Sequence, residues 1–202
     1  PYQHARMYAG TRVFGANCAD AESLTRAEIE GRRQVRALLD IVRKYLPEAQ
    51  VSLQSLPARI GIRETRHVRC GYQLTGDDVL SGRRFDDAIA NGSYPVDVHH
   101  HDRPGITFRY LNGEQEYMRP DVLVVKSRWR PPVESDPTFY QIPFRSLIPA
   151  GGFGNVILAG RMLDADTLAH GAIRVMVNMN QTGEAAGIAA YLSLHRNRPI
   201  RE

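Results

Sequence analysis

A segment of small residues near the C-terminal end constrains this chain more than any other feature. Residues 155–159 (NVILA) form a short apolar run that ends at Gly160, a pattern typical of a buried strand followed by a tight turn. Further along, Gly183 and Gly187 are four residues apart in a glycine- and alanine-rich segment, so a helix places both on one face. Because each glycine destabilises a helix by about 1 kcal/mol relative to alanine, this face predicts close approach to another backbone or to a flat ligand.

Four short motifs follow one another along the rest of the chain. Their sequences are IGIRETR at residues 60–66, LSGR at 80–83, IPFRSLIP at 142–149 and AGR at 159–161. In this order they resemble the motifs of the bacterial FAD-dependent oxidoreductases, a group within the glutathione-reductase-like flavoprotein superfamily. The resemblance covers most of the chain from about residue 11 onward, and the four ordered motifs make it specific.

The resemblance implies an α/β fold, present in this chain as an α+β fragment. The expected parts are a portion of an FAD/NAD(P)-binding Rossmann-like domain and a β-rich substrate domain. We expect residues 1–140 to form the substrate or cap domain, with one long amphipathic helix at about 25–46. Residues 141–202 are expected to complete the FAD-binding domain, with the strand at 155–159 added to its sheet.

The glycine fingerprint that opens such a nucleotide-binding domain is missing. The only comparable cluster, GGFG at 151–154, precedes a predicted strand instead of following one, and its spacing differs from Gly-x-Gly-x-x-Gly. We therefore expect a nucleotide-binding half that lies upstream or on a partner chain. Without that half, core faces would be exposed, so the chain is expected to be paired or poorly stable. A homo-oligomer is a further expectation.

The same resemblance implies an FAD cofactor and a first set of site residues. The predicted helix start should present N–H groups to the flavin pyrimidine, where a helix N-terminus favours the negative charge of reduced flavin. The end of the predicted strand should pass close to the ribityl or phosphate part. The predicted cofactor-binding residues are Ala159, Gly160 and Arg161 at the strand end, and Arg174, Val175, Met176 and Asn178 at the helix start.

The polar cluster DVHHHD at 97–102 is the most suggestive candidate for proton chemistry. Strand alternation places Asp97 and His99 on one face, with His101 continuing it. Such a histidine can move protons near neutral pH, alternating His and Asp can chelate a metal, or the histidines can simply be exposed at a strand end. The resemblance, in which Asp-x-His is frequent here, favours His99 as the acceptor of the substrate proton, with Glu64 in reserve. No metal is predicted.

Arg63, Tyr140 and Arg145 complete the predicted catalytic set. Arg63 and Glu64 lie on opposite faces of an expected strand at 51–69, so one of them faces inward or toward a ligand, unless both belong to an ion-paired network. Tyr140 and Arg145 are polar residues in an otherwise apolar run, which suits a cavity wall. Arg145 is expected to hold a substrate anion, to balance charge on reduced flavin, or to form a structural ion pair. The implied reaction is hydride transfer between a small organic substrate and flavin N5, with a sugar, polyol or hydroxy acid as the substrate.

Local patterns predict several elements of secondary structure. Thr25 and Glu28 form a capping box before an apolar helical stripe that stops at Pro47. The other expected elements are a capped turn at 75–78, a short helix at 85–90, and strands at 105–110 and 122–126.

Amino-acid composition bears on whether the protein binds nucleic acid, spans a membrane or is exported. The chain has 43% hydrophobic and 24% charged residues, which is ordinary for a globular protein, and its formal net charge is +4. Its arginines form no dense block interleaved with aromatic residues, so nucleic-acid binding is not predicted. No apolar run is long enough to cross a bilayer. Cys18 and Cys70 are expected to be free thiols in a reducing compartment, which favours the cytoplasm; because the chain starts at Pro1, export stays open.

Overall fold

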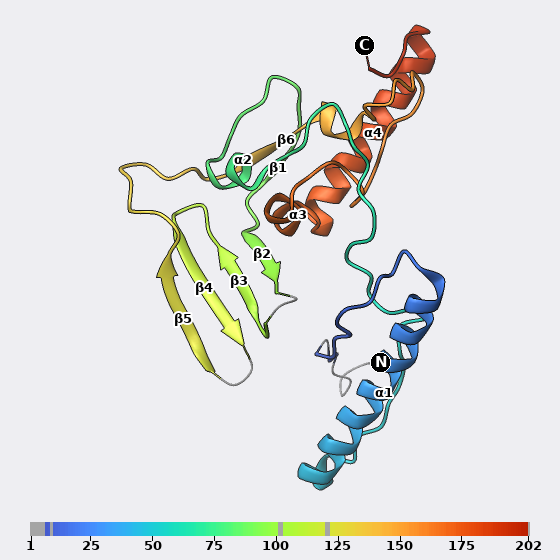
Figure 1. Cartoon of the computed structure of the whole chain (residues 1–202), viewed down its shortest axis with the longest axis vertical. Helices are drawn as coiled ribbons and strands as arrows, with labels where there is room; N and C mark the ends of the chain where they lie inside the picture. Colours follow the sequence, from blue (N-terminus) through green and yellow to red (C-terminus); the bar gives the residue numbers. More distant parts are fainter. Residues whose placement is uncertain (1–6, 9, 101–102, 120–121, 202) are drawn as a thin grey trace. The chain divides into compact units, whose positions relative to one another are not determined.

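The computed structural model describes residues 7–8, 10–100, 103–119 and 122–201, which divide into two compact units (Figure 1). The first unit is Pro1–Thr65 and the second is Arg66–Glu202, and each is described by itself. The expected boundary between residues 140 and 141 concerns a different division, into a substrate part and an FAD-binding part, and stays a prediction.

The first unit is built on one long helix, α1 (Ala21–Tyr45), followed by the short 3-10 helix η1 (Pro47–Ala49). Its N-cap is Asp20, whose carboxylate accepts a hydrogen bond of 2.8 Å from the Ser23 amide. The predicted start at Thr25 was therefore wrong: Thr25 lies inside the helix and its hydroxyl donates to the Ala21 carbonyl. Aspartate is at least as good an N-cap as threonine, and it stands one turn earlier.

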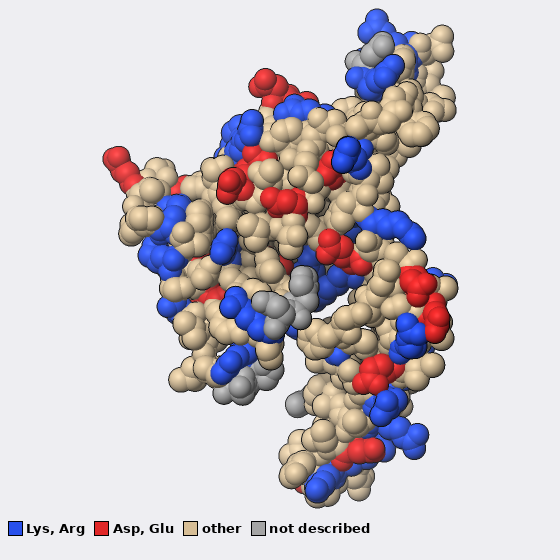
Figure 2. Space-filling view, viewed as in Figure 1, with Lys and Arg blue, Asp and Glu red and all other residues tan. Residues whose placement is uncertain are grey.

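Charged side chains on α1 alternate in sign (Figure 2). Arg26 pairs with Glu22, Arg32 with Glu28, and Arg33 with Glu30, each three or four residues apart. Such exposed pairs add only a few tenths of a kcal/mol each. The arginines of these pairs thus lie on a solvated face of the helix.

The segment after α1 is not the strand that alternation predicted over residues 51–69. It runs as irregular chain, and α1 side chains hold part of it: the Glu28 carboxylate accepts from the Ile60 amide at 2.8 Å, and Arg32 donates to the Ala58 carbonyl. The Ile60 N–H, and then Arg32, lower the pKa of Glu28. An alternating pattern forms a strand only beside a partner strand, and none pairs with this segment within the described residues.

Within its described residues, the second unit contains two antiparallel sheets and four helices, so the α+β class predicted for the fragment is confirmed. The larger sheet has the order β2 (Val96–His99), β3 (Ile106–Arg109), β4 (Glu114–Arg119) and β5 (Val122–Arg128), and the smaller sheet pairs β1 (Ala88–Gly92) with β6 (Tyr140–Pro143). The helices are α2 (Gly76–Leu80), the 3-10 helix η2 (Phe144–Leu147), α3 (Thr167–Ile173) and α4 (Met176–Arg196). The strands predicted at 105–110 and 122–126 are therefore confirmed, as is the capping box at Thr75 and Asp78.

Two other local predictions were wrong. Residues 85–90 form a turn leading into β1 instead of a helix, because Ala88 and its neighbours pair with β6 and the Gln141 side chain accepts from the Phe85 amide. Residues 155–159 form no strand either. Their one backbone bond to a distant segment is from the Leu158 amide to the Leu147 carbonyl at 2.9 Å, and no strand within the described residues lies beside them to continue a ladder.

The core of the second unit lies where α2, α3 and the β1–β6 pair meet, and its largest fully buried members include Leu74, Ile142, Leu147, Leu163 and Ile173. Helix α3 packs directly on β2, at Gly171. A Cβ atom at Gly171 would lie 2.6 Å from the backbone oxygen of Asp97, so only glycine permits this approach. Gly171 thereby determines how closely α3 and the residues after it sit against the strand that carries Asp97 and His99.

Helix α4 has an exposed apolar side. Its exposed large residues include Met176, Ile188, Tyr191 and Leu194. A Cβ atom at Gly183 or Gly187 would meet no atom within 4 Å in the described structure, so the close approach predicted for this face is not made by this chain. None of the helices in the described ranges has both the length and the apolar character needed to cross a membrane.

We predict opposite effects for alanine at two helical glycines. Gly171→Ala should lower the free energy of unfolding by about 1–3 kcal/mol, because the added methyl group overlaps the Asp97 carbonyl. Gly187→Ala, which meets open space, should raise it by about 1 kcal/mol through helix propensity. Chemical denaturation of both variants measures the difference, and a Gly171→Ala variant as stable as the unmodified chain would contradict the packing described.

Candidate functional site

The junction between α3 and α4 brings together several residues that the sequence marked out. Only Arg174 and Val175 separate the two helices. The Arg174 amide still donates to the His170 carbonyl at 3.2 Å, closing α3, whereas the amides of Asn178 and Met179 both donate to the Val175 carbonyl at 3.1 Å, opening α4. The prediction that a helix starts within residues 174–178 is therefore confirmed.

The first turn of α4 is open. The side chains of Asp20, Thr75 and Asp166 cap α1, α2 and α3, but no side chain caps α4 at Val175. The side chains of the first two helical residues are exposed, Met176 by 82% and Val177 by 69%. Because the first amides of a helix lack partners within it, this end offers N–H groups and the positive end of the helix dipole to its surroundings.

A buried hydrogen-bond network supports the junction from below. Tyr140 is fully buried on β6, and its hydroxyl lies 3.1 Å from the Ala172 carbonyl and 3.3 Å from the Tyr94 carbonyl. The Asn178 side-chain amide donates to the Tyr140 oxygen at 3.0 Å and also approaches the Ala172 carbonyl at 3.3 Å. Tyr140, predicted as a cavity wall residue, is thus placed in the core beneath the helix start.

The protonation state of Tyr140 follows from this burial. Desolvation raises the pKa of Tyr140 to about 12, although the hydrogen bond from Asn178 acts in the opposite direction. The hydroxyl therefore stays protonated at neutral pH and serves as a neutral donor to the backbone. Asn178, predicted to contact the cofactor, is itself buried and presents its amide to Tyr140.

The second group at the junction centres on Asp97. Its Oδ2 accepts from Arg174 Nη2 at 2.9 Å and from the Tyr94 hydroxyl at 3.3 Å. The same Arg174 nitrogen lies 3.3 Å from the Asp97 backbone oxygen, so Nη2 contacts both the side chain and the backbone of Asp97. Asp97 is buried and Arg174 is largely shielded from solvent, so loss of either partner would leave the other charge poorly compensated. Arg174 is thereby tied to β2 and keeps Nε and Nη1 without partners among the described residues.

His99 lies beside this pair, as the alternation of β2 predicted. Its Nε2 is 3.1 Å from Asp97 Oδ1, close enough for an ion pair when the imidazole is protonated, but the two atoms are not aligned for a hydrogen bond. His99 is half-buried, with its side chain 21% exposed.

Arg145 contacts an aspartate and two aromatic rings of its own unit. Its Nη1 lies 2.6 Å from Asp87 Oδ1, and its backbone amide donates to the other carboxylate oxygen at 3.1 Å. The guanidinium also lies over the rings of Tyr72 and Phe85, at 4.8 and 5.4 Å from their centroids. These contacts favour the ion-pair alternative, and a contact with substrate stays a prediction.

The remaining predicted residues lie elsewhere along the chain. Gly160 has a φ of +118°, a backbone conformation that favours glycine, and its neighbours Ala159 and Arg161 are exposed. Arg63 and Glu64 are exposed residues of the first unit. His101 lies outside the described residues. The predicted roles of these residues stay predictions.

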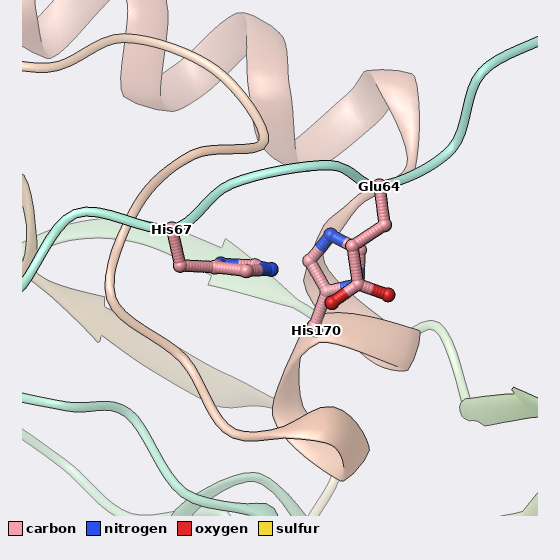
Figure 3. A group of neighbouring side chains, drawn as sticks. All are labelled: Glu64, His67 and His170. Atoms are coloured by element: carbon pink, nitrogen blue, oxygen red, sulfur yellow. The ribbon is translucent and has the colours of Figure 1, made fainter. Parts of the chain in front are cut away.

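Sequence reasoning missed a pair of histidines in the second unit, His67 and His170 (Figure 3). Their ring centroids are 4.8 Å apart and the rings meet edge to face at 86°. His67 Nδ1 lies 3.0 Å from the Leu163 carbonyl, which can only accept, so Nδ1 carries the proton. Figure 3 also draws Glu64, which belongs to the first unit. Imidazoles are common metal ligands, but two are fewer than the three that a catalytic zinc requires, and we assign no metal to this pair.

The stability of the junction predicts an alkaline response. Tyr140→Phe should cost about 1–2 kcal/mol at neutral pH, because one buried hydrogen-bonding group is lost. Since folding raises the pKa of Tyr140 from 10.0 to about 12, the unfolded chain releases this proton first, and stability falls as pH rises through that interval. Between pH 10 and 12 the unmodified protein should therefore lose about 2–3 kcal/mol relative to Tyr140→Phe, so the difference between their free energies of unfolding shrinks and then changes sign. The exposed Tyr191→Phe is the control; curves that stay parallel for Tyr140→Phe would contradict the assignment.

Three comparisons with known proteins were made, and one of them gave a match. A family model described as FAD dependent oxidoreductase matches residues 2–202. A search of curated proteins and a search of solved structures each gave no match.

Proposed function

Because this chain belongs to the FAD dependent oxidoreductase family, we propose that it forms the flavin-capping and substrate-side part of such an enzyme. The cofactor of the family is FAD, and its members are oxidoreductases. The proposed reaction is hydride transfer between a small organic molecule and the flavin. A sugar, a polyol or a small hydroxy acid is the substrate class that we propose to test first.

The observation that carries the proposal is the uncapped N-terminus of α4. A flavin ring accumulates negative charge at its pyrimidine edge when reduced, and free helix amides favour charge of that sign. Met176 and Val177 are exposed at this end, and no side chain forms a capping hydrogen bond there. An uncapped helix start suits the pyrimidine edge of FAD, and this supports the proposal.

Three side chains would serve the reaction around this helix end. When bound, FAD would supply the acceptor for the substrate hydride. His99 would accept the proton that the substrate releases, and Asp97 would stabilise the resulting imidazolium. Arg174, fixed by Asp97 through Nη2, would direct its two remaining donor nitrogens toward developing negative charge. Gly160 with Arg161 would lie along the ribityl or phosphate part.

A second candidate function is a non-catalytic part that needs a partner chain carrying the nucleotide-binding half. The apolar residues exposed on α4 favour it, together with the open face at Gly183 and Gly187. Absorbance near about 450 nm, the flavin band, separates the two candidates. If this chain takes up FAD and becomes yellow, it forms a flavin site by itself. If it stays colourless while a longer protein containing it is yellow, a second part is required. A colourless longer protein would contradict both.

We predict that a negatively charged N-cap residue on α4 raises the stability of the helix but weakens FAD binding. Val175→Asp should stabilise the helix by about 1 kcal/mol, since aspartate caps the open amides, and Val175→Asn should do the same. In the flavin-loaded protein the added carboxylate should weaken FAD binding and make the flavin harder to reduce, because negative charge then faces negative charge. The neutral Val175→Asn should show the smaller effect. Dye-equilibration redox titration measures this, and equal potentials for the two variants would count against the proposed ring position.

We predict a large kinetic effect at His99. With a substrate found by screening hydroxy acids, polyols and sugars, His99→Gln should lower kcat by about 100-fold or more, the range for loss of a general base. The amount of bound flavin should not change. His195→Gln, in the exposed last turn of α4, is the matched control and should leave kcat unaltered. A His99→Gln enzyme with full kcat and an unaltered pH profile would remove His99 from the mechanism.

A further inference from the structure

A small polar hollow lies on the face of the larger sheet opposite to Asp97 and His99. Strand register brings its walls together: Val96 on β2 pairs with Arg109 on β3, Val98 pairs with Thr107, and Arg109 pairs with Gln115 on β4. Paired residues point to the same face, so these side chains converge. Its volume is about 130 Å³, and we call it the anion pocket, defined by His100, Arg103, Thr107, Arg109 and Gln115 over an apolar floor from β2 and α3.

The anion pocket contains positive charge, and none of the described residues that line it is a carboxylate. Arg109 uses only Nε, which donates to Gln115 Oε1 at 2.8 Å, and its two terminal nitrogens have no partner in the described part of the chain. Arg103 lies over the Tyr117 ring, 5.4 Å from its centroid, with Nη2 3.5 Å from His100 Nε2. The Gln115 contact fixes the direction of the Arg109 guanidinium, so its free edge is presented in one orientation.

The other polar groups line the wall beside the guanidinium groups. The Thr107 hydroxyl lies 2.7 Å from His100 Nε2, and both residues line the pocket. Arginine nitrogens can only donate, so His100 Nε2 accepts from Arg103 and the Thr107 hydroxyl, and the two guanidinium groups are the donors left for a ligand. A half-enclosed place that offers two guanidinium groups selects a ligand with acceptor oxygens and negative charge.

We propose that the anion pocket binds the acidic group, carboxylate or phosphate, of a small molecule. A single water needs about 10–15 Å³ of such space, and a drug-sized ligand needs about 300–1,000 Å³. The volume of 130 Å³ therefore accommodates one acidic group with a few waters and is too small for a whole dinucleotide. The pocket lies on the other face of β2 from His99, and the proposal does not rest on flavin chemistry.

Titration with two simple anions tests the proposal. Inorganic phosphate and acetate are added separately to the isotope-labelled protein at constant ionic strength, kept with chloride, and amide and arginine Nε–H signals are followed by NMR. We expect saturable shifts at Arg109 Nε–H and along β2 and β3. Tighter binding of phosphate assigns a phosphate group to the natural ligand, and tighter binding of acetate assigns a carboxylate. If neither anion gives a saturable shift there, the proposal fails.

Two arginine variants distinguish binding in the anion pocket from non-specific attraction of anions to the positively charged protein. Arg109→Gln should weaken binding by about tenfold or more, the loss expected for a charge-assisted hydrogen bond. Arg36→Gln, on the exposed side of α1, removes the same charge and should leave binding unchanged. If Arg109→Gln fails to fold, Arg103→Gln, outside the strands, carries the same test. Equal affinity in the pocket variant and the unmodified protein, or equal loss in Arg36→Gln, would overturn the assignment.

Discussion

The backbone oxygen of Ala172 is the atom on which the candidate site depends most. It belongs to the last turn of α3, whose carbonyls have no partners within the helix, and it is buried, where an unsatisfied group costs about 1–3 kcal/mol. The Tyr140 hydroxyl from β6 and the Asn178 amide from α4 both reach it. One oxygen thus joins a strand and two helices, and it determines the direction in which α4 begins. A junction with an apolar residue at either position would leave that direction unspecified.

Asp97 adds a second constraint at the same place, through charge instead of a neutral network. Replacing a buried ion pair with apolar residues often costs nothing, so the pair with Arg174 is weak evidence of stabilisation. Its effect is geometric: Arg174 is held at two points on Asp97, and the strand backbone is brought against α3 by the absence of a side chain at Gly171. His99 then stands beside a carboxylate whose other oxygen is already engaged. The positions of the base and of the guanidinium are therefore coupled, since both depend on one aspartate.

The sequence predicted features that short segments determine and missed those that distant segments determine. The capping box at Thr75, the stop at Pro47, the face shared by Asp97 and His99 and the start of α4 all follow from neighbours within a few residues. The segments at 51–69, 85–90 and 155–159 were misassigned, because an apolar or alternating run becomes a strand only where another strand lies beside it. The contact of Arg174 with Asp97 spans 77 positions and that of Tyr140 with Asn178 spans 38, and no local pattern contains either. The family resemblance supplied the cofactor, which the local patterns could not.

Helix α4 departs from the capping rule that the other α-helices of the described chain obey. The other three α-helices carry good capping side chains, whereas α4 has a valine at its N-cap and two glycines on a face that touches nothing in the described structure. Each departure costs about 1 kcal/mol in an isolated helix. Local inconsistencies of this kind concentrate at functional sites, because a ligand or a partner supplies the compensation. Both departures have one explanation if α4 directs its amide end at a flavin ring and its bare face at the nucleotide-binding half that holds it. A helix capped and packed entirely by its own chain would have no room for either.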